Sequence, residues 1–493
     1  MNYIIGVDIG TTNSKAVAYS FDGKVLGQAN AGYMPITLHE GHHELDPLIL
    51  LNSVIDIVRQ TVHECSDHLL AGICFSSAMH GLIAVDHSGK PLTNMITWAD
   101  LRSSSYAKKL KDTEAGIRLY HETGTPVHAM SPLCKLMWMR ENASDIFLNT
   151  HKFISIKEFI FFHFFDEYVV DHSVASSTGL FDIHGLDWSR EALATAGITA
   201  DKLSRHVAAD VIIRGLNEKT ASMLNVDRDT AFIIGGSDGC MAHIGSNAFK
   251  HKDVSLTIGT SGAVRIMNDA PVMDARRRIF NYLVTDDLYL SGGPVNNGGN
   301  VLQWFAGNFL GNNFASPDEI QLFITKAMKV APACDGLIFL PYIYGERAPV
   351  WDAEARGIFF GVSATHTLSH FMRASMEGIC FSLFSILQSI EEITGPVNDI
   401  FVSGGFIRSR EWVSLLSDVF GKPLHVMHAE DSSAAGAAIL GLKSLGIIKD
   451  WKDAASFFTE SEVYEPDLHL HEVYLRNYEV YSTLYNKFRN INN

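Results

Sequence analysis

Basic residues are scarce in this sequence. It contains 39 Lys and Arg against 55 Asp and Glu, which gives a formal net charge of −16. Such an acidic balance argues against nucleic acid or an anionic membrane surface as the main partner. Any phosphate group that the protein binds must therefore be held by local groups rather than by the overall charge.

Long hydrophobic runs and paired cysteines are also missing. The most apolar stretch, EFIFFHFFDE at 158–167, is far shorter than the roughly 18 residues that a membrane helix needs. The N-terminus has no basic segment ahead of an apolar one, so we expect no signal peptide. Six cysteines are scattered without a CxxC pair, which is typical of reduced thiols. These absences predict a cytoplasmic protein.

The common nucleotide-binding motifs are absent too. The sequence has no GxxxxGK[ST] loop, no GxGxxG after a strand-like run, and no HRD or DFG segment. It does contain a near repeat, IGTT at 9–12 and IGTS at 258–261, and each copy follows an apolar run. The offset of 249 residues (258 − 9) is close to half of the 493 residues. We therefore expect a duplicated α/β architecture, with domains at 1–246 and 247–493.

The repeated segments have the composition of strand–turn–strand hairpins that bind phosphate. Glycine lets the backbone approach a ligand closely, and exposed N–H groups and Thr or Ser hydroxyls can donate to phosphate oxygens. Asp8 stands just before the first turn, and a carboxylate there suits Mg²⁺ better than bare phosphate. A simple hairpin turn is the alternative for one copy alone. The second copy favours two hairpins that hold a polyphosphate from both sides.

A third glycine motif occurs in DIFVSGGFIRSREW at 399–412. It has the pattern of a strand, then Gly404 and Gly405, then a helix that begins near Ser409. Paired glycines at a strand end leave room for a flat ring, which suits adenine, and a structural turn is the alternative. Ahead of this motif, apolar residues at three- and four-residue steps predict one long helix over 366–394.

Together with GERAPVWDAEARGIFFGVS at 345–363, these motifs resemble those of the FGGY family of carbohydrate kinases over nearly the whole chain. The resemblance implies two actin/hexokinase-like (ribonuclease H-like) α/β domains with a cleft between them, and ATP and Mg²⁺ as cofactors. It also implies a catalytic base at Asp238, in GGSDGC, where a strand-like run ends in a carboxylate among small residues. A helix N-cap is the alternative role for Asp238.

The resemblance further implies a set of nucleotide contacts, which are Thr11, Thr12, Asn13, Lys15, Gly259, Thr260, Gly299, Gln303, Gly404, Gly405 and Ser409. Two of them depart from the family pattern, because some relatives carry Arg where this chain has Lys15 and Asn where it has Ser409.

Segments of the first half indicate the acceptor. TWADLRS (97–103) and TGTPVHAMSPLCKLMW (123–138) are similar to the gluconate kinases of the family, whereas Met79-His80-Gly81 is similar to xylulose kinases. The resemblance thus implies phosphorylation of D-gluconate to 6-phospho-D-gluconate. Its candidate substrate contacts are Met79, His80, Trp98, Asp100, Arg102, His128, Met130 and Asp238. The substrate carboxylate needs a cation or a good N–H donor, for which His80, Arg102, His128 and Lys135 are candidates.

Two other functions stay open at this point. A xylulose kinase is the alternative within the family, and a conformational ATPase like actin or Hsp70, indifferent to sugars, is the alternative of another class. The HEGHHE run at 39–44 lacks the Cys or second His pair that would complete a zinc site. We expect a small sugar acid and ATP as partners, and no feature of the sequence tests whether the protein forms a homodimer.

Overall fold

The computed structural model describes residues 1–489 except 38, 312, 315, 428–430 and 459–461. Within them, a six-stranded sheet is built from the first half of the chain, in the order β13-β14-β5-β1-β2-β3. Its strands are β13 (Ile212–Ile213), β14 (Phe232–Ser237), β5 (Leu69–Ser77), β1 (Asn2–Ile9), β2 (Asn13–Ser20) and β3 (Val25–Gly32). The hairpin β1–β2 is antiparallel, and β1 is parallel to β5.

A seven-stranded sheet from the second half repeats this arrangement, in the order β17-β18-β16-β15-β21-β22-β23. The hairpin β15–β16 is antiparallel, and β15 is parallel to β21. The strands are β17 (Phe280–Thr285), β18 (Leu288–Val295), β16 (Gly262–Asn268), β15 (Val254–Ile258), β21 (Ile400–Ser403), β22 (Leu424–Val426) and β23 (Val463–Tyr464). The duplicated α/β fold that the sequence predicts is confirmed, whereas the division at residue 246 stays a prediction.

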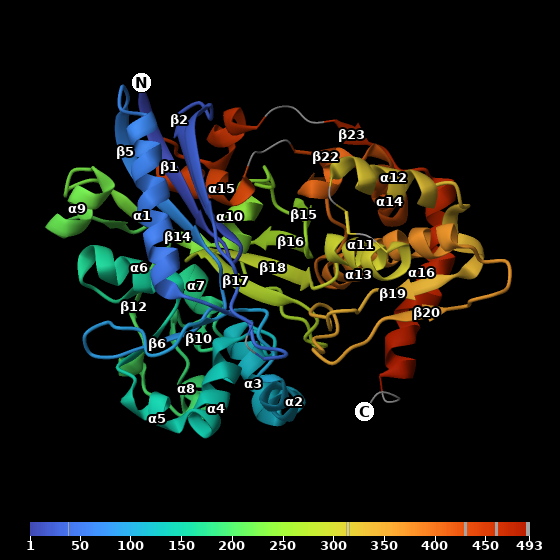
Figure 1. Cartoon of the computed structure of the whole chain (residues 1–493), viewed down its shortest axis with the longest axis horizontal. Helices are drawn as coiled ribbons and strands as arrows, with labels where there is room; N and C mark the ends of the chain where they lie inside the picture. The colour runs from blue at the N-terminus through green and yellow to red at the C-terminus, as the bar shows by residue number, and fades with distance from the viewer. Residues whose placement is uncertain (38, 312, 315, 428–430, 459–461, 490–493) are drawn as a thin grey trace.

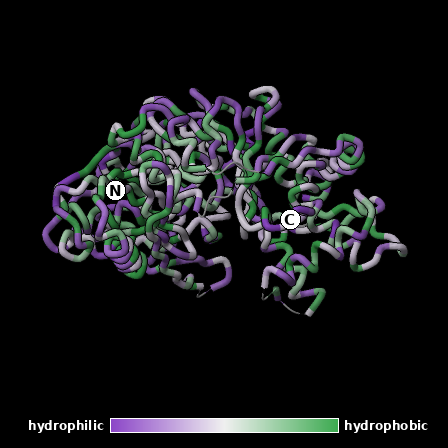
Figure 2. Tube along the Cα trace, turned by 90° about the horizontal axis from the view of Figure 1, so that it is seen from above, coloured by the Kyte–Doolittle hydropathy of each residue, from purple (hydrophilic) through white to green (hydrophobic). Residues whose placement is uncertain are grey.

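The two halves lie side by side as two lobes (Figure 1). Seen from above, the N-terminus belongs to one lobe and the C-terminus to the other, and hydrophobic segments are distributed through both (Figure 2). This matches two large apolar clusters, one centred on the strands of each sheet. No helix among the described residues is both long and apolar enough to cross a bilayer, and EFIFFHFFDE belongs to α6 (Ile156–Phe165), which is buried in the core of the first lobe.

A separate apolar cluster supports the segments that carry most of the substrate candidates. It is formed largely by short helices of the first half, at the lower left of Figure 1. They are α2 (Ser104–Lys111), α3 (Glu114–Thr123), α4 (Pro132–Asn142), α5 (Ser144–Asn149) and α8 (Arg190–Ala196). The loops of TWADLRS and TGTPVHAMSP are thereby fixed beside the second half.

The long helix predicted over 366–394 is confirmed as α13 (Leu368–Thr394). It ends where Gly395 adopts a positive φ of 76°, a conformation that glycine tolerates best. The other helices are α1 (Pro47–Glu64), α7 (His172–Ser176), α9 (Glu218–Leu224), α11 (Gly299–Phe305), α12 (Pro317–Ala327), α14 (Arg410–Phe420) and α16 (Leu468–Phe488). Short strands are β4 (Glu44–Leu45), β6 (Ile83–Val85), β7 (Met95–Ile96), β8 (Lys152–Ile154), β9 (Val169–Asp171), β10 (Phe181–Asp182), β11 (Asp187–Trp188), β12 (Arg205–Val207), β19 (Ile338–Leu340) and β20 (Ile358–Phe360).

The halves meet where α10 (Asp238–Ile244) crosses α15 (Ser432–Ser444). The crossing is very close, because a Cβ on Gly436 would lie 1.9 Å from the Met241 carbonyl oxygen, and one on Gly245 would lie 1.8 Å from that of Ser432. Helix α15 also packs on the first sheet, where a Cβ on Gly6 would lie 2.0 Å from the Ala434 carbonyl oxygen. Helix α15, which belongs to the second half of the chain, thus packs directly against the sheet of the first half.

Candidate active site

The turns of the two repeated hairpins line one cavity between the halves, with a volume of about 410 Å³. We call it the interdomain cavity. The first half contributes Thr11, Thr12, Met79, His80, Trp98 and Asp238; the second contributes Thr257, residues 259–263, Arg265, Phe280, Tyr282, Pro294, Asn296, Asn300 and Arg347. The structure therefore brings the turns of IGTT and IGTS to the same cavity.

Backbone hydrogen bonds hold both turns in shape. In the first turn, the Gly10 N–H donates to the Asn13 carbonyl at 3.0 Å. In the second, the Gly259 N–H donates to the Ser261 carbonyl at 2.8 Å, and the Gly259 carbonyl accepts from the Gly299 N–H at 2.8 Å. The Asn300 N–H likewise donates to the Thr260 carbonyl at 3.2 Å, so the N-terminus of α11 holds the second turn in place.

Asp238 is the first residue of α10, immediately after β14. The N-cap is Ser237, so the alternative N-cap role does not fall to Asp238. Its Oδ1 accepts from the Gly239 N–H at 2.7 Å. Burial raises the pKa of the Asp238 carboxyl, while the nearby Arg265 guanidinium and the Gly239 N–H act in the opposite direction. The result is a carboxylate in the cavity wall whose proton affinity exceeds that of an ordinary aspartate.

Asp8 is the residue before the last one of β1, just ahead of the first turn. It lies opposite Lys15 in the β1–β2 register, and its Oδ1 accepts from Ser76 Oγ at 2.7 Å. Burial and the neighbouring carboxylates of Asp431 and Asp238 hold the pKa of Asp8 well above its usual range. Such crowding of carboxylates fits a divalent cation, which would relieve the local negative potential. Among the described residues, no group of three or more His, Cys, Asp and Glu side chains is arranged to hold a metal on its own.

A second cavity of about 570 Å³ adjoins the first, and Gly259, Thr260 and Asn300 line both. We call it the apolar cavity, because Leu302, Phe314, Ile320, Ile324, Phe406 and Trp412 are among its lining residues. Four predicted nucleotide contacts, Gly299, Gln303, Gly405 and Ser409, also line it. Its shape and lining suit a flat apolar ring beside a phosphate-binding turn.

Three other predicted nucleotide contacts lie outside the lining of both cavities. Gly404 packs against the second hairpin, because a Cβ at this position would lie 2.4 Å from the Ile258 carbonyl oxygen. Its φ of 106° is also a conformation that favours glycine. Asn13 and Lys15 begin β2, behind the first turn. Contact of these three with a nucleotide stays a prediction.

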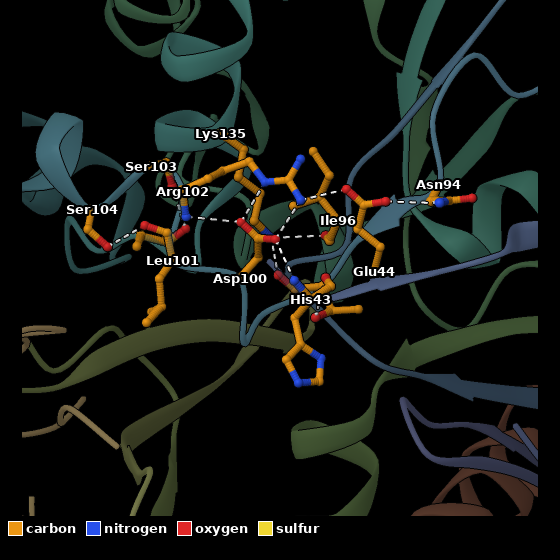
Figure 3. A network of polar contacts seen from close by, with 12 residues as sticks. His43, Glu44, Asn94, Ile96, Asp100, Leu101, Arg102, Ser103, Ser104 and Lys135 are labelled. Carbon is orange, nitrogen blue, oxygen red and sulfur yellow. Dashed lines mark hydrogen bonds and ion pairs between the residues drawn. The ribbon is translucent and has the colours of Figure 1, made fainter. Parts of the chain in front are cut away.

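Asp100 and Arg102 are bound to each other (Figure 3). Arg102 Nη2 donates to Asp100 Oδ2 at 2.7 Å and to Glu44 Oε1 at 2.5 Å, and the His43 N–H donates to Asp100 Oδ2 at 2.7 Å. Asp100 is fully buried, and neither residue lines the interdomain cavity. Their contact with a substrate stays a prediction, and their observed partners stabilise the loop that carries Trp98.

Lys135, His128 and Met130 also lie outside the interdomain cavity lining. Lys135 Nζ donates to the carbonyls of His80, Ile96 and Thr97 at 2.6, 3.1 and 2.8 Å, and burial lowers its pKa to about 7. His128 lines a smaller neighbouring cavity with Trp351, and burial lowers its pKa to about 3. Met130 is completely buried.

His80, Met79 and Trp98 do reach the interdomain cavity. His80 Nδ1 donates to the Ser177 carbonyl at 2.8 Å, and burial holds the pKa of His80 well below its usual range. The ring is therefore neutral with Nε2 as an acceptor, which suits a sugar hydroxyl. Trp98 Nε1 donates to Thr11 Oγ1 at 3.3 Å and so links the substrate loop to the first hairpin.

Sequence analysis missed several polar residues of the cavity wall, among them Arg265, Tyr282 and Arg347. Arg265 had a visible signal, because a charged residue interrupts the apolar strand AVRIM. Arg347 lies inside the GERAPVWD motif, but the motif alone does not show which way its side chain points. Tyr282 looks like any strand aromatic in the sequence.

A duplicated α/β fold in which a glycine hairpin of each half lines one cavity is that of the actin/hexokinase-like class of proteins. Within this class, the model of the FGGY family of carbohydrate kinases, N-terminal domain, matches residues 3–245, and the C-terminal domain model matches residues 254–445. The chain belongs to this family and is a kinase that transfers phosphate to an alcohol group. Because the chain is a kinase of this family, the alternative of a conformational ATPase that is indifferent to sugars is set aside.

Among sequence relatives, the chain is 41% identical to the gluconokinase of Bacillus subtilis (strain 168) over 461 residues, which are 92% of this chain and 90% of the relative. It is 29% identical to a xylulose kinase of Staphylococcus epidermidis (strain ATCC 12228 / FDA PCI 1200) over 493 residues, 99% of this chain and 97% of the relative. The predicted resemblance to the gluconate kinases of the family is confirmed.

Solved structures give the same picture. A gluconate kinase from Lactobacillus acidophilus superposes with a TM-score of 0.93 at 33% identity, covering 99% of this chain and 98% of that chain. A ligand-bound xylulose kinase from the same organism also has a TM-score of 0.93 at 33% identity, covering 99% of both chains. The fold alone therefore does not separate these two substrates.

Proposed function

We propose that the protein transfers the γ-phosphoryl group of MgATP to the terminal hydroxyl of D-gluconate, giving ADP and 6-phospho-D-gluconate. The observation that carries the proposal is the carboxylate of Asp238 in the wall of the cavity between the two hairpins. Similarity to gluconokinases at 41% identity supports gluconate as the acceptor.

In this reaction Asp238 accepts the proton of the attacking hydroxyl as the new P–O bond forms and the bond to ADP breaks. The raised proton affinity of its buried carboxyl supports this role. His80 Nε2 and the Trp98 ring would orient the sugar chain. The Thr11, Thr12 and Thr260 hydroxyls and the turn N–H groups would hold the transferring phosphate between them.

We assign adenosine to the apolar cavity, against Gly405 and Ser409, and Mg²⁺ to the region of Asp8. The neighbouring carboxylates that raise the pKa of Asp8 support a cation there. Bound Mg²⁺ would neutralise phosphate charge during transfer. We further propose that the domain boundary lies between residues 246 and 247, in the segment that joins α10 to β15.

Side-by-side assays of sugar-dependent ADP release test the proposal. D-gluconate should give the highest kcat/KM when it is compared with D-xylulose and glycerol. Release of ADP at the same rate with every sugar, or with none, would contradict it.

D-xylulose kinase activity is the second candidate, because the ligand-bound xylulose kinase structure matches this chain as well as the gluconate kinase structure does. A kcat/KM for D-xylulose above that for D-gluconate would favour this candidate. The same assay therefore decides between the two.

A further inference from the structure

The carboxylate of a sugar acid needs a donor in the interdomain cavity, and several candidates already donate elsewhere. Arg102 pairs with Asp100 and Glu44 (Figure 3), and Lys135 donates to three backbone carbonyls. His80 is neutral and presents an acceptor nitrogen rather than a donor. None of these three groups is set to receive an anion in this cavity.

Arg347 lines the same cavity and differs from them in its pairing. It is only 7% exposed, and no carboxylate among the described residues forms an ion pair with its guanidinium. Its Nη2 donates to the Val295 carbonyl at 3.1 Å, while Nε is buried without a hydrogen-bond partner. The carboxylates of Glu346 and Asp238 raise the pKa of Arg347 against the effect of burial, without an ion pair to the guanidinium. A buried guanidinium that lacks a direct acidic partner and a hydrogen bond at Nε fits a site that an anionic ligand completes.

The adjacent Glu346 does not supply the missing counter-charge by direct contact. Its Oε1 accepts from the backbone N–H groups of Asn296 and Arg347 at 2.6 and 2.8 Å, and its Oε2 accepts from Asn297 Nδ2 at 3.0 Å. The carboxyl is thereby held by the backbone, and burial raises its pKa to about 7. The Arg347 guanidinium lies instead over the Trp98 ring, 4.6 Å from the ring centroid.

A second unpartnered donor belongs to the same wall. Tyr282 is 1% exposed, its hydroxyl has no hydrogen-bond partner among the described residues, and its ring stacks on Phe280 at 4.1 Å between centroids. Tyr282 and Arg347 line the same cavity, and the charge of Arg347 partly offsets the rise that burial causes in the pKa of Tyr282. A guanidinium N–H and a phenol O–H in the wall of one cavity can both donate to one carboxylate.

We propose that Arg347 and the Tyr282 hydroxyl bind the carboxylate of the sugar acid and so select acids over neutral sugars. The inference rests on the proposed gluconate kinase function and names the group that recognises its substrate class. Asp238 acts on the pKa of both arginines of the cavity lining, Arg265 and Arg347, but the larger effect of an arginine on the pKa of Asp238 comes from Arg265.

The transferring phosphate is the other anion that Arg347 could meet. His80, Trp98 and Tyr282 are neighbours of Arg347, and the proposed function assigns His80 and Trp98 to the sugar, so these surroundings favour the sugar acid. The two anions can be separated by experiment.

The test compares the wild-type protein with Arg347→Met by equilibrium titration calorimetry. The ligands are D-gluconate, D-glucitol, in which a hydroxymethyl group replaces the carboxylate, and ADP. Loss of a charge-assisted hydrogen bond should weaken gluconate binding roughly 10- to 100-fold, with glucitol and ADP binding unchanged. Weaker ADP binding with unchanged gluconate binding would assign Arg347 to phosphate and overturn the inference.

Two milder variants keep the test valid if Arg347→Met does not fold. Thermal unfolding checks the folding of every variant. Tyr282→Phe removes only the hydroxyl and should weaken gluconate but not glucitol binding. Arg347→Lys keeps the charge but loses the planar fork, so gluconate affinity should fall less than in Arg347→Met. Unchanged gluconate affinity in both variants would overturn the inference even where Arg347→Met does not fold.

Arg356→Met is the matched control, since Arg356 is exposed on the same loop and lies outside the interdomain cavity. It should bind all three ligands as the wild type does. If the wild-type protein itself prefers xylulose in the ADP-release assay, the proposed function fails. If the wild type phosphorylates gluconate and both Arg347→Met and Tyr282→Phe bind it normally, only the carboxylate assignment fails.

Discussion

At the scale of single residues, Asp238 combines a position in the cavity wall with a raised pKa. A general base must be deprotonated to act, so activity should rise with pH through this raised value. The same carboxylate lies near two arginines, Arg265 and Arg347, which limit the rise. The site thus holds a base that is stronger than a solvent-exposed aspartate and still ionisable.

Asp238→Asn should lower kcat by roughly 10²–10⁴-fold, the contribution of a general base. Nucleotide binding should survive, because Asp238 does not line the apolar cavity. Steady-state kinetics and calorimetry with ADP measure the two effects separately. Asp210→Asn, a change at an exposed turn, serves as the control. Near-normal turnover in Asp238→Asn would remove this residue from the role.

On the proposed role of Asp8 as a Mg²⁺ ligand, the metal requirement should depend on pH. The pKa of Asp8 is raised, so without a metal the carboxyl remains protonated above the usual aspartate range and becomes a ligand only as pH rises through the raised value. The Mg²⁺ concentration for half-maximal rate should therefore fall as pH rises. Asp8→Asn should weaken activation and flatten this dependence. An unaltered profile in Asp8→Asn would argue against a metal role.

Site residues that belong to short contiguous motifs could be predicted from the sequence. Contacts between residues that are far apart in the sequence could not. Thr11, Thr12 and Thr260 belong to turns whose shape is local, and all three line the interdomain cavity. Arg102 illustrates the opposite case, because its partner Glu44 lies 58 residues away in the sequence. Asp100, the other partner of Arg102, is only two residues away, but no local pattern reveals the pairing with Glu44.

At the scale of elements, the crossing of α10 and α15 connects the segment that carries Asp238 to the second half. Helix α10 begins with Asp238, and the glycine at 436 lets α15 approach its backbone. The single long helix α13 was predictable because its apolar period repeats over many turns. The crossing of α10 and α15 could not be predicted. Small residues in a sequence show that another element can come close, but they do not show which element it is.

Gly436→Ala should force this crossing apart, since the added Cβ would meet the Met241 carbonyl oxygen at 1.9 Å. We expect a loss of roughly 1–3 kcal/mol in the free energy of unfolding, the usual cost of overpacking. Turnover should also fall, because α10 carries Asp238. Chemical denaturation and kinetics check both effects.

Gly32→Ala is the control for that substitution, because nothing lies within 4 Å of a Cβ at Gly32. It should leave both stability and activity close to the wild type. Equal stability of the Gly436→Ala and Gly32→Ala proteins would show that the crossing tolerates a side chain.

At the scale of the whole molecule, the interdomain cavity is lined by both halves, so a change in the angle between them alters the site. Water competes with the sugar as an acceptor, and closure would exclude it before transfer. The α10–α15 crossing, where the halves are in closest contact, is the natural pivot for such a motion.

Closure should appear in solution as a smaller radius of gyration when gluconate and a non-hydrolysable ATP analogue are both present. Small-angle scattering of the free protein, of each binary complex and of the ternary complex measures it. Superimposable profiles for all four samples would contradict the hinge.

The two cavities share a wall at Gly259, Thr260 and Asn300. On the proposed reaction, the sugar hydroxyl and the departing ADP therefore lie on opposite sides of the phosphorus atom. A single direct displacement between them inverts the stereochemistry at phosphorus, and no phosphorylated form of the protein is needed on the way. If the terminal phosphate of ATP is made chiral with oxygen isotopes, the sugar phosphate should therefore have the inverted configuration at phosphorus.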